Sequence, residues 1–210
     1  MQPLHHLALA SASPRRRELL TSLGLRVTVV ASSYFELPLA DHTPRELAIA
    51  HAHGKAAGAP ESKFPIVAAD TVVDLDGVAL GKPLDRAEAR SMLERLSGRE
   101  HSVHTAFALR DDSSGRTAAA CRTTRVTFAA LSSDTIDAYV AGGDGLDKAG
   151  AYGIQGFAAT LVERIDGDYF TVVGFPLTAF AQALPQIGYE LRPPDVRDKT
   201  GVIRPAEVRA

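Results

Sequence analysis

The chain has 210 residues, of which 45% are hydrophobic and 23% are charged, enough for one domain or for two small lobes around a cleft. A formal net charge of −2 argues against a general nucleic-acid-binding protein, whose surface would be basic. Cys121 is the only cysteine, which excludes an intramolecular disulfide and a thiolate zinc cluster and fits a reducing compartment. Because no apolar run approaches the roughly 20 residues of a membrane span and no secretory signal is recognisable, a soluble cytoplasmic protein is expected.

Short apolar segments bounded by polar or turn residues predict five buried strands. Residues 74–77 predict a hairpin turn after the third of them. Strands that alternate with helices predict an α/β fold, and the hairpin favours a mixed sheet. The strands are expected at residues 7–10, 27–31, 66–73, 103–109 and 122–128.

Helix signals lie between these strands. Ser13 followed by a proline predicts an N-cap and a first helical residue. Thr43, Pro44 and Glu46 predict a second helix that opens with a capping box. Gly54 lies inside that second helix and weakens it by about 1 kcal/mol relative to alanine. Two further helices are predicted at residues 85–96 and 133–140.

The C-terminal part of the chain is less regular. Residues 167–176 are bounded by glycine and proline and predict a strand that leads into a final helix. From residue 192 onward, prolines and charges predict an extended or disordered tail. We therefore expect one domain at 1–191 and a tail at 192–210.

The junction between the first strand and the first helix collects groups that bind phosphate. Ser11 and Ser13 offer hydroxyls, Arg15 and Arg16 offer guanidinium groups, and the helix start offers free amides and a positive dipole end. Taken alone, the same residues are also compatible with a capped surface helix whose arginines are solvated.

A carboxylate lies inside the apolar strand at 66–73. Asp70 must be paired, capped or metal-bound there, because an isolated buried charge costs several kcal/mol. Lys82 follows on a tight turn near the same strand end, and a carboxylate with a nearby lysine suits a hydrolytic site. The alternative is an aspartate that ends the strand and caps a turn.

The glycine-rich run at 147–156 allows close approach of backbone to a ligand. Within it, the amide of Gln155 donates and accepts hydrogen bonds, so it can read the edge of a base. A flexible loop without a ligand is the alternative. The spacing of the histidines does not favour zinc, and neither a P-loop, a dinucleotide fingerprint nor a serine-hydrolase motif is present.

Taken in order, these runs resemble the Maf family of nucleoside triphosphate pyrophosphatases over about residues 5–185. Glu36 and Lys55 match the glutamate and the lysine of the family, although the segment at 32–36 lacks the acidic residues that commonly precede that glutamate. The other matching runs are residues 9–20, 69–73, 80–83, 96–99, 146–156 and 172–176.

The resemblance implies an elongated mixed sheet, two lobes and a cleft, similar to inosine triphosphate pyrophosphatases. It implies cleavage between the α- and β-phosphates, a divalent cation (Mg²⁺ or Mn²⁺) and a homodimer. The run that ends at Gln155 resembles the subgroup that prefers dTTP and UTP. The implied catalytic residues are Asp70, Glu36, Lys55 and Lys82, with Asp70 and Glu36 as metal ligands, and the implied substrate-binding residues are Ser11, Ser13, Arg15, Arg16, Thr71 and Gln155.

The leading hypothesis is therefore a pyrophosphatase that hydrolyses dTTP, UTP and modified pyrimidine nucleotides to the monophosphate and pyrophosphate. Cations aimed at the phosphates would stabilise the charge that develops there. The sequence leaves open whether Asp70 acts as a base or only as a metal ligand. A nucleotide-binding regulator of cell division without turnover is the alternative, and a phosphatase that releases orthophosphate is a third hypothesis.

Overall fold

A computed structural model describes residues 1–36 and 41–193 of the chain. Its centre is a sheet of seven strands, which is mixed as predicted, with parallel strands at one edge and antiparallel strands through the rest. The strand order is β3 (Arg26–Val29), β2 (His6–Leu9), β4 (Ile66–Leu75), β6 (Glu100–Asp111), β7 (Arg116–Phe128) and β8 (Val162–Asp166), with β5 (Val78–Leu80) paired to β4.

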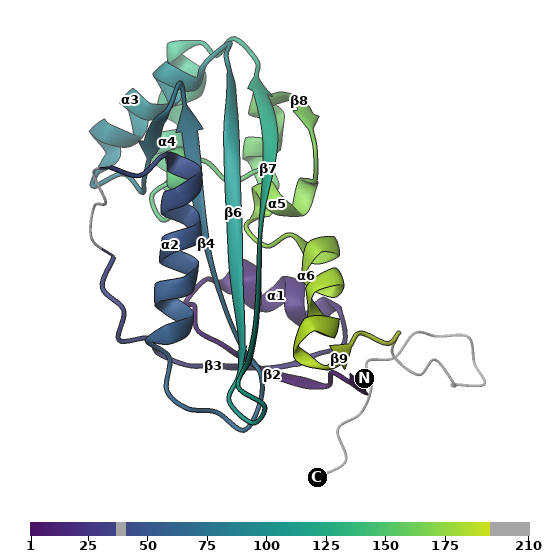
Figure 1. Cartoon of the computed structure of the whole chain (residues 1–210). Coiled ribbons are helices and arrows are strands. Elements are labelled where there is room, and N and C mark those ends of the chain that lie inside the picture. Colours follow the sequence, from purple (N-terminus) through teal and green to yellow (C-terminus); the bar gives the residue numbers. More distant parts are fainter. Residues whose placement is uncertain (37–40, 194–210) are drawn as a thin grey trace, which may run out of the picture.

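Helices cover both faces of this sheet (Figure 1). A small parallel pair, β1 (Gln2–Pro3) and β9 (Tyr189–Glu190), joins the two ends of the described chain. None of the helices in the described ranges combines the length and apolar character needed to cross a bilayer. The helices are α1 (Pro14–Ser22), α2 (Pro44–Ala57), α3 (Arg86–Leu96), α4 (Ser133–Gly142), α5 (Tyr169–Val173) and α6 (Leu177–Ala183), with 3-10 turns η1 (Ala149–Ala151), η2 (Gly156–Leu161) and η3 (Leu184–Ile187).

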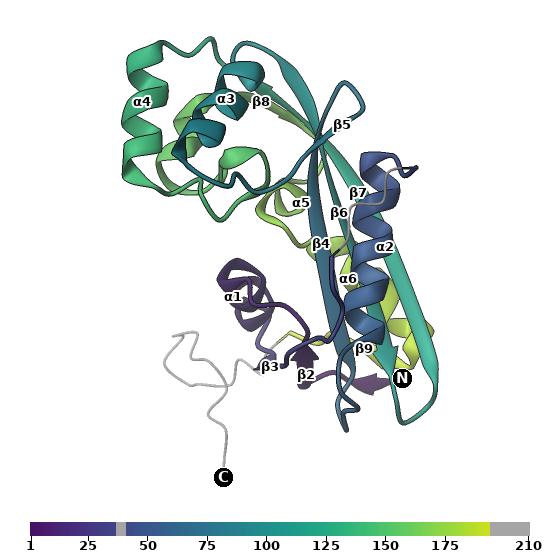
Figure 2. The same ribbon diagram turned by 90° about the vertical axis from the view of Figure 1, so that its left-hand side faces the viewer.

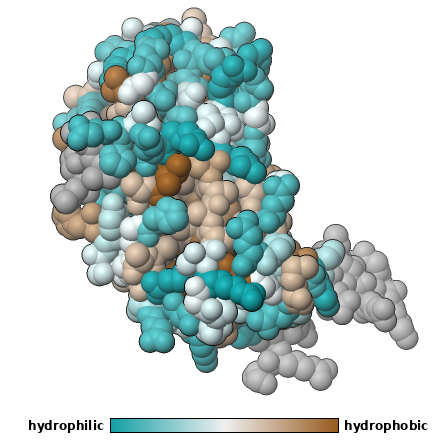
Figure 3. All heavy atoms as spheres, in the orientation of Figure 1, coloured by the Kyte–Doolittle hydropathy of each residue, from teal (hydrophilic) through white to brown (hydrophobic). Residues whose placement is uncertain are grey.

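The molecule is elongated and has two lobes, as the resemblance implied (Figure 2). The long strands β4, β6 and β7 run through both lobes. One lobe has its own core, in which α3, α4 and the chain around Tyr152 pack on the ends of these strands. In the other lobe, α1 and α6 pack on one sheet face and α2 packs on the opposite face. Polar side chains dominate both ends of the face in Figure 3, and apolar ones gather over its middle.

Small residues bring α2 close to the sheet. Ala48, Ala52 and Ala56 recur every four residues, which places them on one helical face, and all three are buried. They pack against small side chains of β4 and β6, among them Ala68 and Ala106. This close approach places the C-terminal half of α2 beside the middle of β4.

The local signals of the sequence are largely confirmed. Asp76 and Gly77 have φ values of 55° and 81° and form the two-residue turn of the β4–β5 hairpin. Thr43 and Glu46 form the complete capping box of α2. Ser13 is the N-cap residue of α1, but its side chain makes no cap bond, so this part of the prediction was wrong.

The strand predicted at 167–176 is also wrong. The segment forms α5, because the Asp168 carboxylate accepts from the amides of Phe170 and Thr171 and so caps a helix start. Gly174, with a φ of 119°, ends the helix in a left-handed conformation. The final helix predicted after this segment is present as α6. The predicted tail lies outside the described residues from position 194 onward.

Candidate active site

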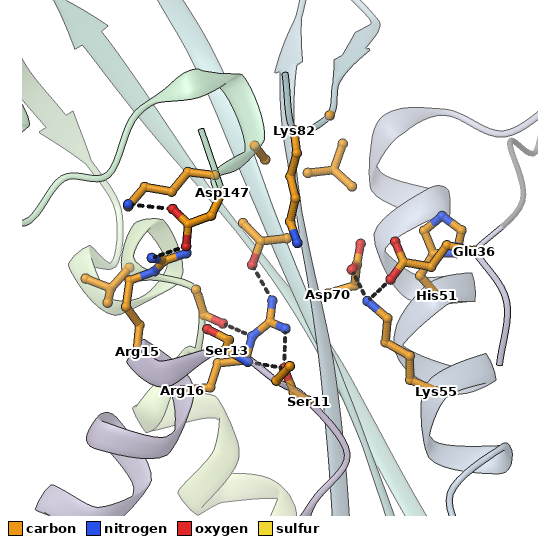
Figure 4. Close-up of a pocket in the computed structure, with 18 of the residues that line it drawn as sticks. Ser11, Ser13, Arg15, Arg16, Glu36, His51, Lys55, Asp70, Lys82 and Asp147 are labelled. Carbon is orange, nitrogen blue, oxygen red and sulfur yellow. Dashed lines mark hydrogen bonds and ion pairs between the residues drawn. The ribbon is translucent and has the colours of Figure 1, made fainter. Parts of the chain in front are cut away.

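A cavity of about 1090 Å³ lies between the two lobes. Its lining comes from the β2–α1 junction, the segment after β3, α2, β4, the β5 end and the run at 147–155. All ten predicted site residues therefore line one cavity, although they are spread over 145 residues of sequence. They are Ser11, Ser13, Arg15, Arg16, Glu36, Lys55, Asp70, Thr71, Lys82 and Gln155. Figure 4 labels all of them except Thr71 and Gln155.

The β2–α1 junction forms one wall of the cavity. The hydroxyl of Ser11 accepts from the amide of Ser13 at 3.3 Å. Arg15 reaches across to the other lobe, where its guanidinium lies 3.3 Å from a carboxylate oxygen of Asp147. Because the first turn of α1 opens here, its free amides and positive dipole end add to the charge of the arginines.

Arg16 is bound to the protein framework more than the sequence suggested. Its guanidinium donates to the carbonyl of Ala69 at 2.8 Å and to the carbonyl of Gly174 at 3.0 Å. It also donates to the hydroxyls of Ser11 and Thr71, each at 3.0 Å. Burial lowers the pKa of Arg16 below its ordinary value. Four of its five N–H donors are thus used within the protein, and Arg16 ties α1 to β4 and to the end of α5.

Lys55 joins two carboxylates on the opposite wall. Its ammonium nitrogen lies 2.6 Å from Oδ1 of Asp70 and 2.7 Å from Oε1 of Glu36. The side chains of Lys55 and Asp70 are only 15% and 11% exposed, so this pair is shielded from water. Partial burial opposes ionisation of Glu36, but the hydrogen bond and charge of Lys55 outweigh it and lower the pKa of Glu36. Asp70 is therefore paired in mid-strand and does not end β4.

The remaining predicted residues approach from other directions. Lys82 is exposed on the turn after β5, and in Figure 4 its side chain points toward Asp70. Thr71 follows Asp70 in β4 and therefore faces the other side of the sheet, where its hydroxyl contacts Arg16 and Thr105 at 3.0 Å. Gln155 is exposed on the cavity wall formed by the other lobe.

Two further cavity residues with notable contacts, Asp147 and His51, were not among the predicted site residues. Asp147 holds Arg15 and also accepts from Lys148 at 2.7 Å; burial opposes its ionisation, but these cations lower the pKa of Asp147. His51 is 6% exposed and shares a hydrogen bond of 2.9 Å with the hydroxyl of Tyr34. The sequence signal that could have found Asp147 is its place at the start of the glycine-rich run at 147–156. No sequence signal marks His51, because its place in the cavity depends on the contact with Tyr34 in the folded chain.

The two carboxylates suit a divalent cation. Glu36 and Asp70 converge on a single point, which the Lys55 ammonium marks. Mg²⁺ is commonly held by one or two carboxylates together with waters and substrate phosphates. Within the described ranges, no cluster of three or more His, Cys, Asp or Glu side chains could hold a metal. The donor set therefore fits an ion that takes its remaining ligands from water and phosphate.

Together, the mixed α/β fold and an inter-lobe cleft with cations on both walls and a lysine-paired aspartate define the class: a protein with an anion-binding, hydrolytic type of site. Residues 6–187 match the Maf-like protein family, and the chain belongs to this family.

Curated relatives agree with this assignment. A dTTP/UTP pyrophosphatase from Thermus thermophilus is 49% identical over 82% of this chain and 89% of the relative. A dTTP/UTP pyrophosphatase from Methylobacillus flagellatus is 47% identical over 86% of this chain and 92% of the relative. Among solved structures, a HAM1 protein from Coxiella burnetii gives a TM-score of 0.38 at 20% identity, over 59% of this chain and 73% of that chain.

Proposed function

We propose that this protein is a nucleoside triphosphate pyrophosphatase that hydrolyses dTTP and UTP to the monophosphate and pyrophosphate. The observation that carries the proposal is the placement of the Lys55–Asp70 pair and the Ser11–Arg15 corner on facing walls of one cavity. A triphosphate that spans this cavity meets cations at both ends. The names of the relatives support the choice of dTTP and UTP.

The phosphate chain is held by the corner at the start of α1. Phosphate oxygens accept hydrogen bonds from the hydroxyls of Ser11 and Ser13 and from the amides of the first helical turn. Arg15 leaves Asp147 and pairs with the triphosphate. Arg16 keeps its bonds to the framework and adds its positive charge. Lys55 and Lys82 approach from the opposite side. These fixed cations stabilise the negative charge that develops on the phosphate oxygens during attack, which is the main catalytic effect expected of such a site.

Asp70 acts as the general base. The described residues give it one side-chain bond, from Lys55 to Oδ1, so Oδ2 is available to accept from a water. As the water oxygen bonds to the α-phosphorus, its proton passes to Asp70 and the bond from the α-phosphorus to the bridging oxygen breaks. Pyrophosphate then leaves with the electrons of that bond. The hydrogen bond from Lys55 orients the carboxylate of Asp70 for this transfer.

A divalent cation, Mg²⁺ or Mn²⁺, would be held by Glu36 and Asp70. When bound, such an ion neutralises phosphate charge and lowers the pKa of a coordinated water. Lys55 already holds the two carboxylates close together, and its ammonium would have to withdraw from the point between them to admit the ion.

Gln155 reads the base. It lies on the part of the cavity wall that the other lobe forms, and its amide can donate to one carbonyl of a pyrimidine while accepting from the ring N–H. Modified pyrimidine nucleotides that keep this edge are substrates as well.

A substrate panel tests the function. Purified protein is incubated with each nucleoside triphosphate and Mg²⁺ or Mn²⁺, and pyrophosphate and orthophosphate are measured separately. We expect pyrophosphate from dTTP and UTP, and a loss of at least ~100-fold in Asp70→Asn. Asp74→Asn is the matched control, because Asp74 lies in the same strand but does not line the cavity.

Three outcomes would contradict the proposal. Absence of pyrophosphate with every nucleotide would exclude it, and so would release that Asp70→Asn leaves unchanged. Orthophosphate as the product would indicate a phosphatase. The regulator hypothesis requires that Asp70→Asn retain a cellular effect on division, which a strain carrying this variant would reveal.

We further propose a cytoplasmic homodimer whose catalytic domain spans 1–191. The resemblance to the family supports the dimer, and the single cysteine, Cys121, fits a reducing compartment. Sedimentation analysis of the full chain tests the dimer.

A further inference from the structure

The segment that leads from β3 to Glu36 lies directly on the backbone of α2. A Cβ atom at Gly54 would overlap the aromatic ring of Tyr34. A Cβ atom at Gly58 would lie 2.7 Å from the Tyr34 amide nitrogen and 2.8 Å from the hydroxyl of Ser32. Neither glycine has a positive φ, so the space above the helix, and not the backbone conformation, is what requires glycine here.

Hydrogen bonds fasten this segment to the helix end. The amide and the hydroxyl of Ser33 both donate to the carbonyl of Gly58, at 2.9 Å and 3.0 Å. The hydroxyl of Ser32 donates to the carbonyl of Lys55 at 2.9 Å. The carbonyls at a helix C-terminus lack intrahelical partners, so these bonds satisfy acceptors that would otherwise need water.

Tyr34 is fixed at its far end as well. Its hydroxyl lies 2.9 Å from Nδ1 of His51, and the two rings meet edge to face with centroids 5.8 Å apart. His51 is one turn before Gly54 on the same helix and is buried. The ring of Tyr34 therefore rests on Gly54 and is tied to His51, while Glu36 follows two residues later and contacts Lys55.

We propose, resting on the function proposed above, that Tyr34 is a positioning residue: seated on Gly54 and bound to His51, it holds Glu36 against Lys55. The Glu36 side chain is 54% exposed. The contacts of Ser32, Ser33 and Tyr34 order its backbone in advance. A catalytic group that is held in place before the substrate arrives does not lose conformational freedom during the reaction.

A double-mutant cycle tests this positioning role. Gly54→Ala pushes the Tyr34 ring away, and we expect kcat for dTTP to fall at least ~10-fold. Tyr34→Ala gives a similar fall, and the double variant falls no further than Tyr34→Ala alone, because the added methyl group no longer meets a ring. Tyr34→Phe keeps the ring on Gly54 and loses only the bond to His51, so we expect its kcat to fall less than that of Tyr34→Ala. Gly142→Ala is the matched control, since a Cβ atom there meets nothing within 4 Å.

Two readouts separate positioning from general loss of structure. Affinity for a dTTP analogue with a methylene bridge between the α- and β-phosphorus is expected to change less than about threefold, because the corner at Ser11 and Arg15 is untouched. In a Glu36→Gln background, Tyr34→Ala is expected to cause no further fall in kcat. Both results are expected if Tyr34 acts on turnover through Glu36.

The proposal is overturned if Gly54→Ala is fully active, if the effects of Gly54→Ala and Tyr34→Ala multiply, or if Tyr34→Ala still lowers kcat in Glu36→Gln. Thermal unfolding of the wild type, Gly54→Ala, Tyr34→Ala and the double variant gives a test that does not depend on turnover. There, Gly54→Ala is expected to lower Tm in the presence of Tyr34 and to raise it in Tyr34→Ala. If the wild-type protein releases no pyrophosphate, the proposed function fails. The Tm comparison then still tests whether the Tyr34 ring rests on Gly54.

Discussion

Replacing Lys55 with methionine removes the ammonium between two carboxylates and keeps an unbranched side chain that ends at Cε. Asp70, whose side chain is 11% exposed, then lacks its partner at 2.6 Å. Breaking a buried ion pair in this way costs about 3–5 kcal/mol. We expect a value near the lower end, about 3 kcal/mol, because the charge of Arg16 also acts on Asp70. For a protein of this size, that corresponds to a Tm lower by roughly 6–12 °C.

Differential scanning calorimetry at neutral pH measures this change. The double variant Lys55→Met/Asp70→Asn removes the buried one of the two carboxylates that lost their partner, and it is expected to recover most of the lost Tm. Lys63→Met is the control, because Lys63 is exposed and lies over the ring of Phe64. A decrease below about 2 °C in Lys55→Met, or a double variant no more stable than the single one, would refute a shielded Lys55–Asp70 pair.

The same variant has a signature in the pH dependence of stability. Because Lys55 lowers the pKa of Glu36 in the folded protein, ionised Glu36 stabilises the fold above its ordinary pKa of 4.5. This contribution is lost as the pH falls through the lowered pKa of the folded state. In Lys55→Met, the pKa of Glu36 is expected to rise, and this part of the acid sensitivity disappears from the Tm profile.

The remaining predictions concern Arg16 and His101. Arg16→Lys cannot keep the four hydrogen bonds of the guanidinium, so we expect the free energy of unfolding to fall by about 2–3 kcal/mol, seen in urea as a lower midpoint at unchanged slope; an unchanged midpoint would contradict the framework role. Burial lowers the pKa of His101 from 6.5 to about 4, so the unfolded chain binds a proton first and stability decreases as the pH falls from 6.5 toward 4. His101→Gln is expected to flatten the Tm profile in this window, and a profile identical to that of the wild type would contradict it.

Much of the fold follows from local patterns. The apolar segments around Ala68 and Phe107 are strands because they are buried on both faces, which leaves a continuous apolar run in the sequence. Thr43 with Glu46 marks the start of α2 through a purely local capping box. The segment at 169–173 is different: its valines favour a strand, but the carboxylate of Asp168 caps a helix instead, and the two signals compete within a few residues.

The candidate site could be predicted as a set of residues, but not as a geometry. The sequence treats Arg15 and Arg16 alike, whereas the structure uses Arg16 to hold the framework and leaves Arg15 paired to an exposed carboxylate. This difference depends on which carbonyls lie nearby in space, such as that of Ala69. Gly54 appears in the sequence only as a weak point of a helix. Glycine is required at this position because the ring of Tyr34, 20 positions earlier in the chain, fills the space that a Cβ atom would take.

The two halves of the site are joined by the alternation of side chains along β4. Asp70 faces α2 and pairs with Lys55, and the next residue, Thr71, faces the opposite side and bonds to Arg16. One strand thus carries the proposed base on the side of Lys55 and contacts Arg16 on the side of the Ser11–Arg15 corner. The pairing of Asp70 with Ala106 and of Thr71 with Thr105 fixes this arrangement. Because a slip of one residue in β4 would turn each side chain to the other face, the register between β4 and β6 is as much a condition of the site as the residues themselves.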